Sequence, residues 1–395
     1  MSMRVSNSSR YETAISTLQA RQAEMSRAQM QMTSGKRVNL PSDDPTAAAR
    51  AERAFISQQR ITAEQRSVSV SRNAMALVES GLGQAGDLLQ SARESLLASG
   101  NGTYSAGERK ALAVQLTQLR GQLLAVANQT DGAGGFIFGG QGTNSQPFLD
   151  SPAGVVFGGT GGQGQLSVSE QMPTSVDGEA LWLSIRSGNG VFVTDAAATN
   201  TGSGYIAPGG VVDPSLLTGG TYDVTFSVAA GVTTYTVNPT GQTGNYIDGG
   251  TITVDGMALK FGGAPADGDV FNITPSTVDL DPFEALDRAI AVLNNPNANK
   301  GAVAQAVSNG VRDVDAAMSQ FQAARSVAGA TLSRLDSIDD RNQDRDLWAK
   351  SVQSDAEDLD MVQAVSDFQN KQTSYQAALQ SYSMVQSMSL FDYLK

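Results

Sequence analysis

The sequence predicts a mainly α-helical protein with an inserted β domain. Both ends of the chain are expected to form an antiparallel helical rod, which carries a central Gly-rich antiparallel β domain. Two observations predict this fold: apolar residues recur at heptad spacing near both termini, and glycine is concentrated between them. Of the 41 glycines, 27 fall in residues 136–280, against 11 in residues 1–135 and 3 in residues 281–395. Such a turn-rich stretch favours short strands between two helical segments.

The first and last helices are marked by apolar residues at alternating spacings of four and three. This spacing is typical of a coiled-coil interface, and an ordinary amphipathic core helix is the alternative. The N-terminal seam comprises Tyr11, Ile15, Leu18, Gln22, Met25, Gln29 and Met32. The C-terminal seam comprises Met361, Val365, Phe368, Gln372, Tyr375, Leu379 and Tyr382. The glutamines within the seams weaken a helix pair but can fix its register.

Four further segments predict the inner helices. Two of them continue the heptad pattern. One comprises Met75, Val78, Leu82, Ala85, Leu89, Ala92 and Leu96, and the other comprises Arg109, Leu112, Leu116, Leu119, Leu123 and Val126. A long helix is expected over roughly residues 300–339, with Phe321, Ala328, Leu332 and Leu335 on its apolar face. A short helix is expected to begin after Asp281–Pro282 and to stop before Pro296.

The residues between the first seam and the next helix are those that end one helix and start another. Gly35 is expected at the C-terminal cap of the first helix. Ser42 or Asp43 is expected to cap the next helix, with Pro45 in its first turn. We therefore predict a fixed hinge, formed by Gly35, Pro41, Ser42, Asp43, Asp44 and Pro45.

Short alternating segments predict the strands of the middle of the chain. Residues 181–186 (LWLSIR), 222–228 (YDVTFSV) and 232–237 (VTTYTV) alternate between apolar and polar residues. Residues 251–254 and 257–261 flank Asp255–Gly256, which is a strong hairpin signal. Three domains follow: a terminal coiled-coil pair (1–40 with 355–395), an α-helical rod (41–145 with 279–354) and a β-rich surface domain (146–278).

The composition excludes most catalytic chemistry. The 395 residues include no cysteine and no histidine, which removes thiolate nucleophiles, the usual general base and the common zinc ligands. No carboxylate pair or calcium loop stands out, so we predict that the protein is not an enzyme and holds no cofactor or metal. The net charge of −12 argues against nucleic acid or an anionic membrane as partner. No apolar stretch is long enough for a membrane span or a secretory signal, so export would need another machine.

Three stretches resemble one family. They are residues 34–49 (SGKRVNLPSDDPTAAA), residues 134–140 (GGFIFGG, with Phe136 where the family usually has Tyr) and residues 359–395, which contain SLFDYL at 389–394. Together they resemble the flagellin superfamily, and within it the hook-associated proteins. The resemblance covers roughly residues 1–145 and 281–395.

The resemblance implies a structural component of the bacterial flagellum that joins the hook to the filament; flagellin itself is the alternative. An adhesin that uses the β domain is a further alternative, although no aromatic or charged cluster marks a ligand groove. The implied partners are a FlgK-like hook-associated protein, flagellin, identical subunits, a FlgN-like export chaperone and the flagellar type III export apparatus. The implied location is extracellular, after a transient cytoplasmic stage. The implied assembly interface consists of both seams with Leu390, Phe391 and Leu394. We expect residues 1–40 and 355–395 to be largely unfolded in the monomer and to become helical on assembly.

Overall fold

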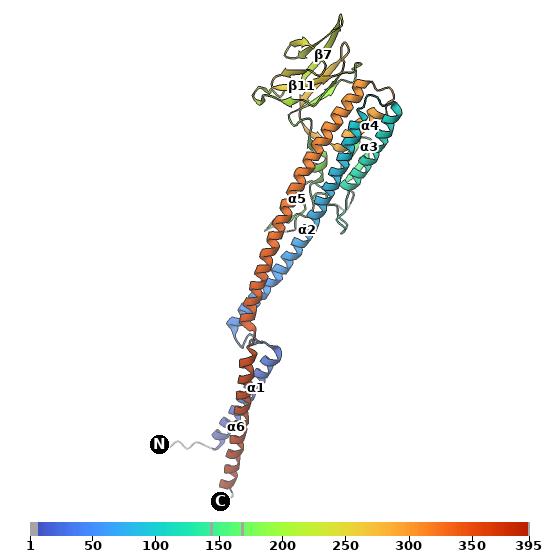
Figure 1. Ribbon diagram of the computed structural model, residues 1–395. Helices are drawn as coiled ribbons and strands as arrows, with labels where there is room; N and C mark the ends of the chain where they lie inside the picture. The colour runs from blue at the N-terminus through green and yellow to red at the C-terminus, as the bar shows by residue number, and fades with distance from the viewer. Residues whose placement is uncertain (1–6, 143–144, 167–169, 394–395) are drawn as a thin grey trace. The chain divides into compact units, whose positions relative to one another are not determined.

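A computed structural model describes residues 7–142, 145–166 and 170–393 (Figure 1). Its contacts divide the chain into two compact units. We call residues 1–66 with 338–395 the terminal unit, and residues 67–337 the central unit. Helices α2 (Pro45–Ser99) and α5 (Lys300–Glu357) each contribute to both units. The chain is mainly helical with a central antiparallel β domain, as the sequence predicts. The division into three domains stays a prediction.

The terminal unit is built from two antiparallel helix pairs. Helix α1 (Asn7–Ser34) packs along α6 (Met361–Tyr393), and Figure 1 shows the two side by side. The rings of Tyr11 and Tyr382 meet edge to face with their centroids 6.3 Å apart. Because Tyr11 lies early in α1 and Tyr382 lies late in α6, this contact confirms that the chain returns antiparallel to its start.

The second pair of the terminal unit joins the start of α2 to the end of α5 through a seam that consists mostly of alanine, with two isoleucines and one asparagine. The buried positions are Ala47, Ala51, Ala54 and Ile61 of α2, and Ile338, Asn342, Ala349 and Ala356 of α5. The Gln58 side chain donates to the Gln353 side chain across the pair, at 2.7 Å. Alanine buries little area per residue, so the apolar stabilisation of this pair is modest.

The helical part of the central unit contains the inner lengths of α2 and α5 with α3 (Ala106–Ala127) and α4 (Pro282–Asn294). The predicted seam of α2, from Met75 to Leu96, is buried at all seven positions. On α3 the prediction is partly wrong, because the buried stripe is Ala113, Leu116, Arg120, Leu123 and Ala127. Arg120 can lie in this stripe because its guanidinium binds two carboxylates, those of Asp150 at 2.7 Å and Asp287 at 2.7 Å.

The core of the helical part surrounds Trp182, which is fully buried. Its ring stacks on Phe283 at 5.8 Å between centroids and tilts against Phe321 at 4.6 Å. The strand predicted over residues 181–186 is therefore wrong. The chain forms a π-helical turn at Glu179–Leu183, followed by the two-residue strand β3 (Ile185–Arg186). The turn allows Leu181 and Trp182, which are neighbours in sequence, both to be buried, whereas a strand would point them to opposite faces.

The β domain contains a five-stranded antiparallel sheet and a smaller one. The larger sheet has the order β4 (Phe192–Ala196), β12 (Val270–Pro275), β7 (Tyr222–Ala229), β8 (Val232–Asn238) and β9 (Gln242–Asn245). In the smaller sheet β11 (Met257–Gly262) pairs with β10 (Thr251–Val254), β5 (Tyr205–Ile206) and β6 (Gly210–Val211). The predicted β7–β8 and β10–β11 hairpins are confirmed, and Asp255 and Gly256 both have positive φ, as the tight turn needs. Two short ladders complete the fold: β1 (Phe148–Ser151) with β2 (Gly154–Phe157), and β3 with β13 (Val278–Leu280).

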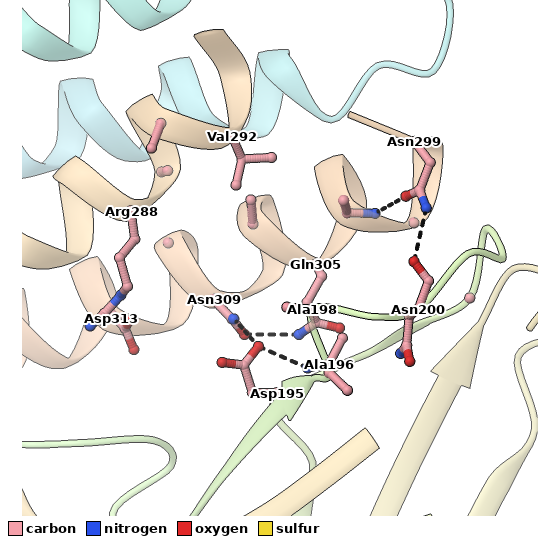
Figure 2. Close-up of a pocket in the computed structure, with 18 of the residues that line it drawn as sticks. Asp195, Ala196, Ala198, Asn200, Arg288, Val292, Asn299, Gln305, Asn309 and Asp313 are labelled. Carbon is pink, nitrogen blue, oxygen red and sulfur yellow. Dashed lines mark hydrogen bonds and ion pairs between the residues drawn. The ribbon is translucent and has the colours of Figure 1, made fainter. Parts of the chain in front are cut away.

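Polar side chains of α5 attach the β domain to the helices (Figure 2). Asn309 donates to the Asp195 carboxylate at 2.8 Å, as Figure 2 shows. Gln305 accepts from the Ile206 backbone N–H at 2.8 Å. The Arg312 guanidinium donates to the Thr194 carbonyl at 2.7 Å. A cavity of about 390 Å³ lies beside these contacts, with many alanine and glycine residues in its wall. Its polar groups already bind one another, so the arrangement serves as a joint between sheet and helix.

Asp281 caps α4, and its raised pKa makes the stability of the protein depend on pH. Its carboxylate accepts from the Phe283 backbone N–H at 2.7 Å, as expected for the cap, but burial raises its pKa from 3.8 to about 6. Because the pKa is higher in the folded state, protonation of Asp281 favours folding. Its contribution to the free energy of unfolding is complete below about pH 4 and is lost as the pH rises through about 6. Asp281→Asn keeps a capping oxygen without the charge. We expect its free energy of unfolding at pH 7.5 to exceed that of the wild type by about 1 kcal/mol.

The measurement is urea unfolding of both proteins at pH 7.5 and pH 5.0. The advantage of Asp281→Asn should shrink or vanish at pH 5.0, because the wild-type carboxyl is then largely protonated. If the two proteins differed in free energy of unfolding by the same amount at both pH values, the raised pKa of Asp281 would be contradicted.

Candidate functional site

In the terminal unit, the connection between α1 and α2 is hydrogen-bonded to the connection between α5 and α6. The residues of the predicted hinge lie in the first connection, which we call the hinge region, and their action as a hinge stays a prediction. The Arg37 backbone N–H donates to the Glu357 carbonyl at 2.7 Å, and the Leu359 N–H donates to the Gly35 carbonyl at 3.0 Å. The Lys36 ammonium binds the Glu357 carboxylate at 2.9 Å. These bonds tie two linkers that are more than 300 residues apart in sequence.

Gly35 and Asp44 define the helix ends at the hinge. Gly35 has φ +71°, and its N–H donates to the Gln31 carbonyl at 2.9 Å, which confirms the predicted C-terminal cap of α1. The predicted cap of α2 by Ser42 or Asp43 is wrong. Asp44 caps it instead, because it directly precedes Pro45, and its carboxylate accepts from the Thr46 and Ala47 N–H groups.

Asp43 and Arg37 complete the hinge. The Asp43 carboxylate accepts from the Asn39 and Leu40 N–H groups and so closes the turn that precedes α2. The hydrogen bond from the Ala47 N–H is the main cause that lowers the Asp44 pKa to about 2, with help from Thr46 and Arg37. Pro41 and Ser42 are exposed.

Asp44→Ala should loosen the first turn of α2, whereas Ser42→Ala should not. The reason is that only the Asp44 side chain accepts from the helix N–H groups. We expect the amides of residues 46–49 to exchange several-fold faster in Asp44→Ala than in the wild type, as measured by hydrogen exchange. Equal effects of the two substitutions would show that the cap is not at Asp44.

The two predicted seams lie along the contact between α1 and α6, which covers them incompletely. The partly buried positions are Tyr11, Leu18, Met25, Met32, Phe368, Tyr375 and Tyr382. The exposed positions are Ile15, Gln22, Gln29, Met361, Val365, Gln372 and Leu379. Leu390 and Phe391 lie in the helical backbone of α6, and Leu394 lies outside the described residues. Among residues 11–34 and 361–384, Ala28 is the one side chain that is buried. One chain therefore leaves much of both seams in contact with water.

Further apolar side chains on the terminal unit were missed by the sequence reasoning. Val362 is 86% exposed and Trp348 is 69% exposed, and the remaining exposed apolar side chains are Met30, Leu40, Phe55, Ile56, Leu347 and Met384. They lie outside the predicted heptad seams, so the heptad spacing gives no signal for them. A single exposed apolar side chain is common in folded proteins, whereas several of them on paired helices favour a protein–protein contact.

The described residues hold neither a cluster of three possible metal-ligating side chains nor a helix with the length and apolar composition of a membrane span. The buried charges have structural partners instead. Arg120 of α3, bound to Asp150 and Asp287, clamps the β1–β2 hairpin and α4 to α3. The surface that stands out is thus the apolar surface of the terminal unit.

Comparison with known proteins identifies the family. Residues 5–143 match the bacterial flagellin N-terminal helical region, and residues 311–394 match the bacterial flagellin C-terminal helical region. The flagellar hook-associated protein 3 of Salmonella typhimurium is 28% identical, over 98% of this chain and 99% of that protein.

Solved structures agree in fold. A crystal structure of FlgL from Xanthomonas campestris is 34% identical with a TM-score of 0.65, and the match covers 70% of this chain and 93% of that one. The flagellar junction protein FlgL of Legionella pneumophila is 27% identical with a TM-score of 0.65, over 72% of this chain and 98% of that one. The chain belongs to the hook-associated protein 3 (FlgL) family, within the flagellin superfamily.

Proposed function

We propose that this chain is a structural component of a bacterial flagellum that links a FlgK-like hook-associated adaptor to the flagellin filament through its helical termini. The observation that carries the proposal is the incompletely covered helix pair of α1 and α6. A helix pair with a single buried alanine in its described side chains is poorly stabilised alone and gains most from packing against other subunits.

Flagellin itself is the less favoured function. Hook-associated protein 3 of Salmonella typhimurium matches along 98% of this chain, which includes the central segment as well as the flagellin-like ends. A flagellin would share the helical ends without this likeness in the middle. The Legionella pneumophila relative carries the name of a junction protein.

The partners that we propose are the FlgK-like adaptor on one side, flagellin on the other, and identical subunits laterally. A FlgN-like chaperone would cover the C-terminal seam in the cytoplasm, and the flagellar type III apparatus would export the chain to its place outside the cell. The chain has no cysteine, so no disulfide would oppose export in an unfolded state. We propose no catalytic role and no cofactor.

Deletion of the gene tests this proposal. We expect cells without the chain to make hooks but no filaments, and to release monomeric flagellin into the medium. The full chain supplied in trans should restore filaments, whereas a chain without residues 361–395 should be synthesised yet fail to restore them. Filaments of normal number and length in the deletion strain would contradict the proposal.

A further inference from the structure

A cavity on the terminal unit combines two cations with an exposed aromatic ring. Arg50, Arg53 and Ser57 of α2 line it together with Trp348 and Val352 of α5, and its volume is about 350 Å³. Trp348 is 69% exposed. Tryptophan and arginine are the residue types that dominate the energetics of protein interfaces, and a free tryptophan ring beside two guanidinium groups is unusual on a surface that has no partner.

The two halves of the terminal unit carry opposite charge. Residues 1–66 contain 10 basic and 6 acidic residues, so their net charge is +4; residues 338–395 contain 5 and 10, so theirs is −5. Some of this charge is neutralised locally, as in the ion pairs Lys36–Glu357 and Lys350–Asp346. The buried seam between α2 and α5 contains mostly alanine and the amides of Gln58 and Gln353, so it offers no carboxylate that would pair with Arg50 or Arg53.

The end of α5 also presents a stripe of two carboxylates and one leucine, Asp340, Asp344 and Leu347, which we call the acidic stripe. The spacings of four and three place these residues on one side of the helix, and all three are exposed. This side is turned away from the buried seam residues Ile338, Asn342 and Ala349. The stripe thus points away from α2, whereas the cavity opens between α2 and α5.

We propose that the cavity at Trp348 binds the acidic stripe of a second copy of this chain. The proposal rests on the proposed function, in which identical subunits lie side by side. Guanidinium–carboxylate pairs would form beside the tryptophan ring, which is covered by Leu347 of the second copy. The cavity and the stripe are different surfaces of the same unit. Such a contact is heterologous, so each copy can bind a neighbour on both sides and the contact propagates around a ring or helix.

Charge reversal in the deletion strain tests this contact. We expect Arg50→Glu with Arg53→Glu to reduce the number of filaments about tenfold or more, because like charges then face one another. Asp340→Arg with Asp344→Arg should do the same. The protein that combines all four substitutions should restore filaments, and so should co-expression of the two double variants, since each then supplies the complement of the other.

Two controls keep the result interpretable. Lys110→Glu with Lys260→Glu reverses two exposed cations of the central unit and should leave filament number unchanged. Each variant must be exported in the same total amount as the wild type, counted in flagella and medium together, and must show the wild-type circular dichroism spectrum. If the wild-type chain itself failed to restore filaments, the proposed function would fall, independently of this contact.

Three results would overturn the contact. The first is normal assembly by the arginine double variant. The second is normal assembly by the aspartate double variant while the arginine variant fails, which would assign the cavity to another protein. The third is a combined variant that is as defective as the double variants.

Trp348 offers a second readout. Acrylamide should quench the fluorescence of Trp348 in the monomer and much less in isolated junctions, whereas Trp348→Phe should show little quenching in either state because Trp182 is buried. Equal quenching of the wild type in monomer and junction would contradict burial of the ring.

Discussion

We expect the backbone amides of α1 and α6 to exchange with solvent almost without protection in the isolated chain, and to become strongly protected on assembly. Ala28 is the one buried side chain among residues 11–34 and 361–384, so the pair buries too little apolar area to hold its own hydrogen bonds. Packing by neighbouring subunits would supply the missing area. The measurement is hydrogen exchange of the purified chain and of isolated hook–filament junctions.

Residues of the central unit serve as the internal control for this experiment. The amides of residues 112–126 in α3 and 303–335 in α5 belong to a helical part with a large buried core, and they should be protected in both states. Strong protection of residues 368–382 in a verified monomer would contradict the account. It would mean that α1 and α6 form a folded core within one chain.

Trp182→Ala should destabilise the central unit by about 4 kcal/mol, the loss typical of removing a large buried aromatic ring. The ring is fully buried and contacts the rings of Phe138, Phe148, Phe283 and Phe321. Urea unfolding followed by circular dichroism measures the loss. Trp348→Ala is the matched control and should change the unfolding free energy by less than about 0.5 kcal/mol, because its ring is exposed.

The indole N–H of Trp182 has no hydrogen-bond partner among the described residues, so the ring stabilises the core through packing alone. Trp182→Phe removes this unsatisfied donor and keeps most of the apolar volume, so it should cost much less than Trp182→Ala. Equal losses for the two substitutions would show that the donor, and not the packing, is what the core needs at this position.

Much of the helical architecture could be predicted from the sequence because its signals are local. Heptad spacing predicts α1, the inner part of α2, and α6, and one glycine predicts the end of α1. The β7–β8 and β10–β11 hairpins could be predicted because alternation and a tight turn lie within twenty residues of each other.

The errors concern residues whose partners are distant in sequence. Arg120 is buried because Asp150 and Asp287 reach it, and nothing near Arg120 in the sequence reports those contacts. Trp182 is in a π-helical turn because Phe283 and Phe321 surround it. The sequence misplaces the cap of α2 by one or two residues because serine and aspartate are both good caps. Only the position at which the helix begins distinguishes Asp44 from Ser42 and Asp43.

The candidate site was predicted in part. The hinge and the two terminal seams follow from local sequence, although their role in assembly stays a prediction. The cavity of Arg50, Arg53 and Trp348 could not be predicted, because it needs α2 and α5 to be side by side and its residues lie outside the seams.

The position of the chain along an intact flagellum tests the central claim most directly. The turn between β7 and β8, at residues 229–232, is exposed and can carry a short inserted epitope. Electron microscopy with gold-labelled antibody should then show a single cluster of label on each flagellum, at the boundary between hook and filament. Label distributed along the filament would contradict the account, because the chain would then be a filament subunit.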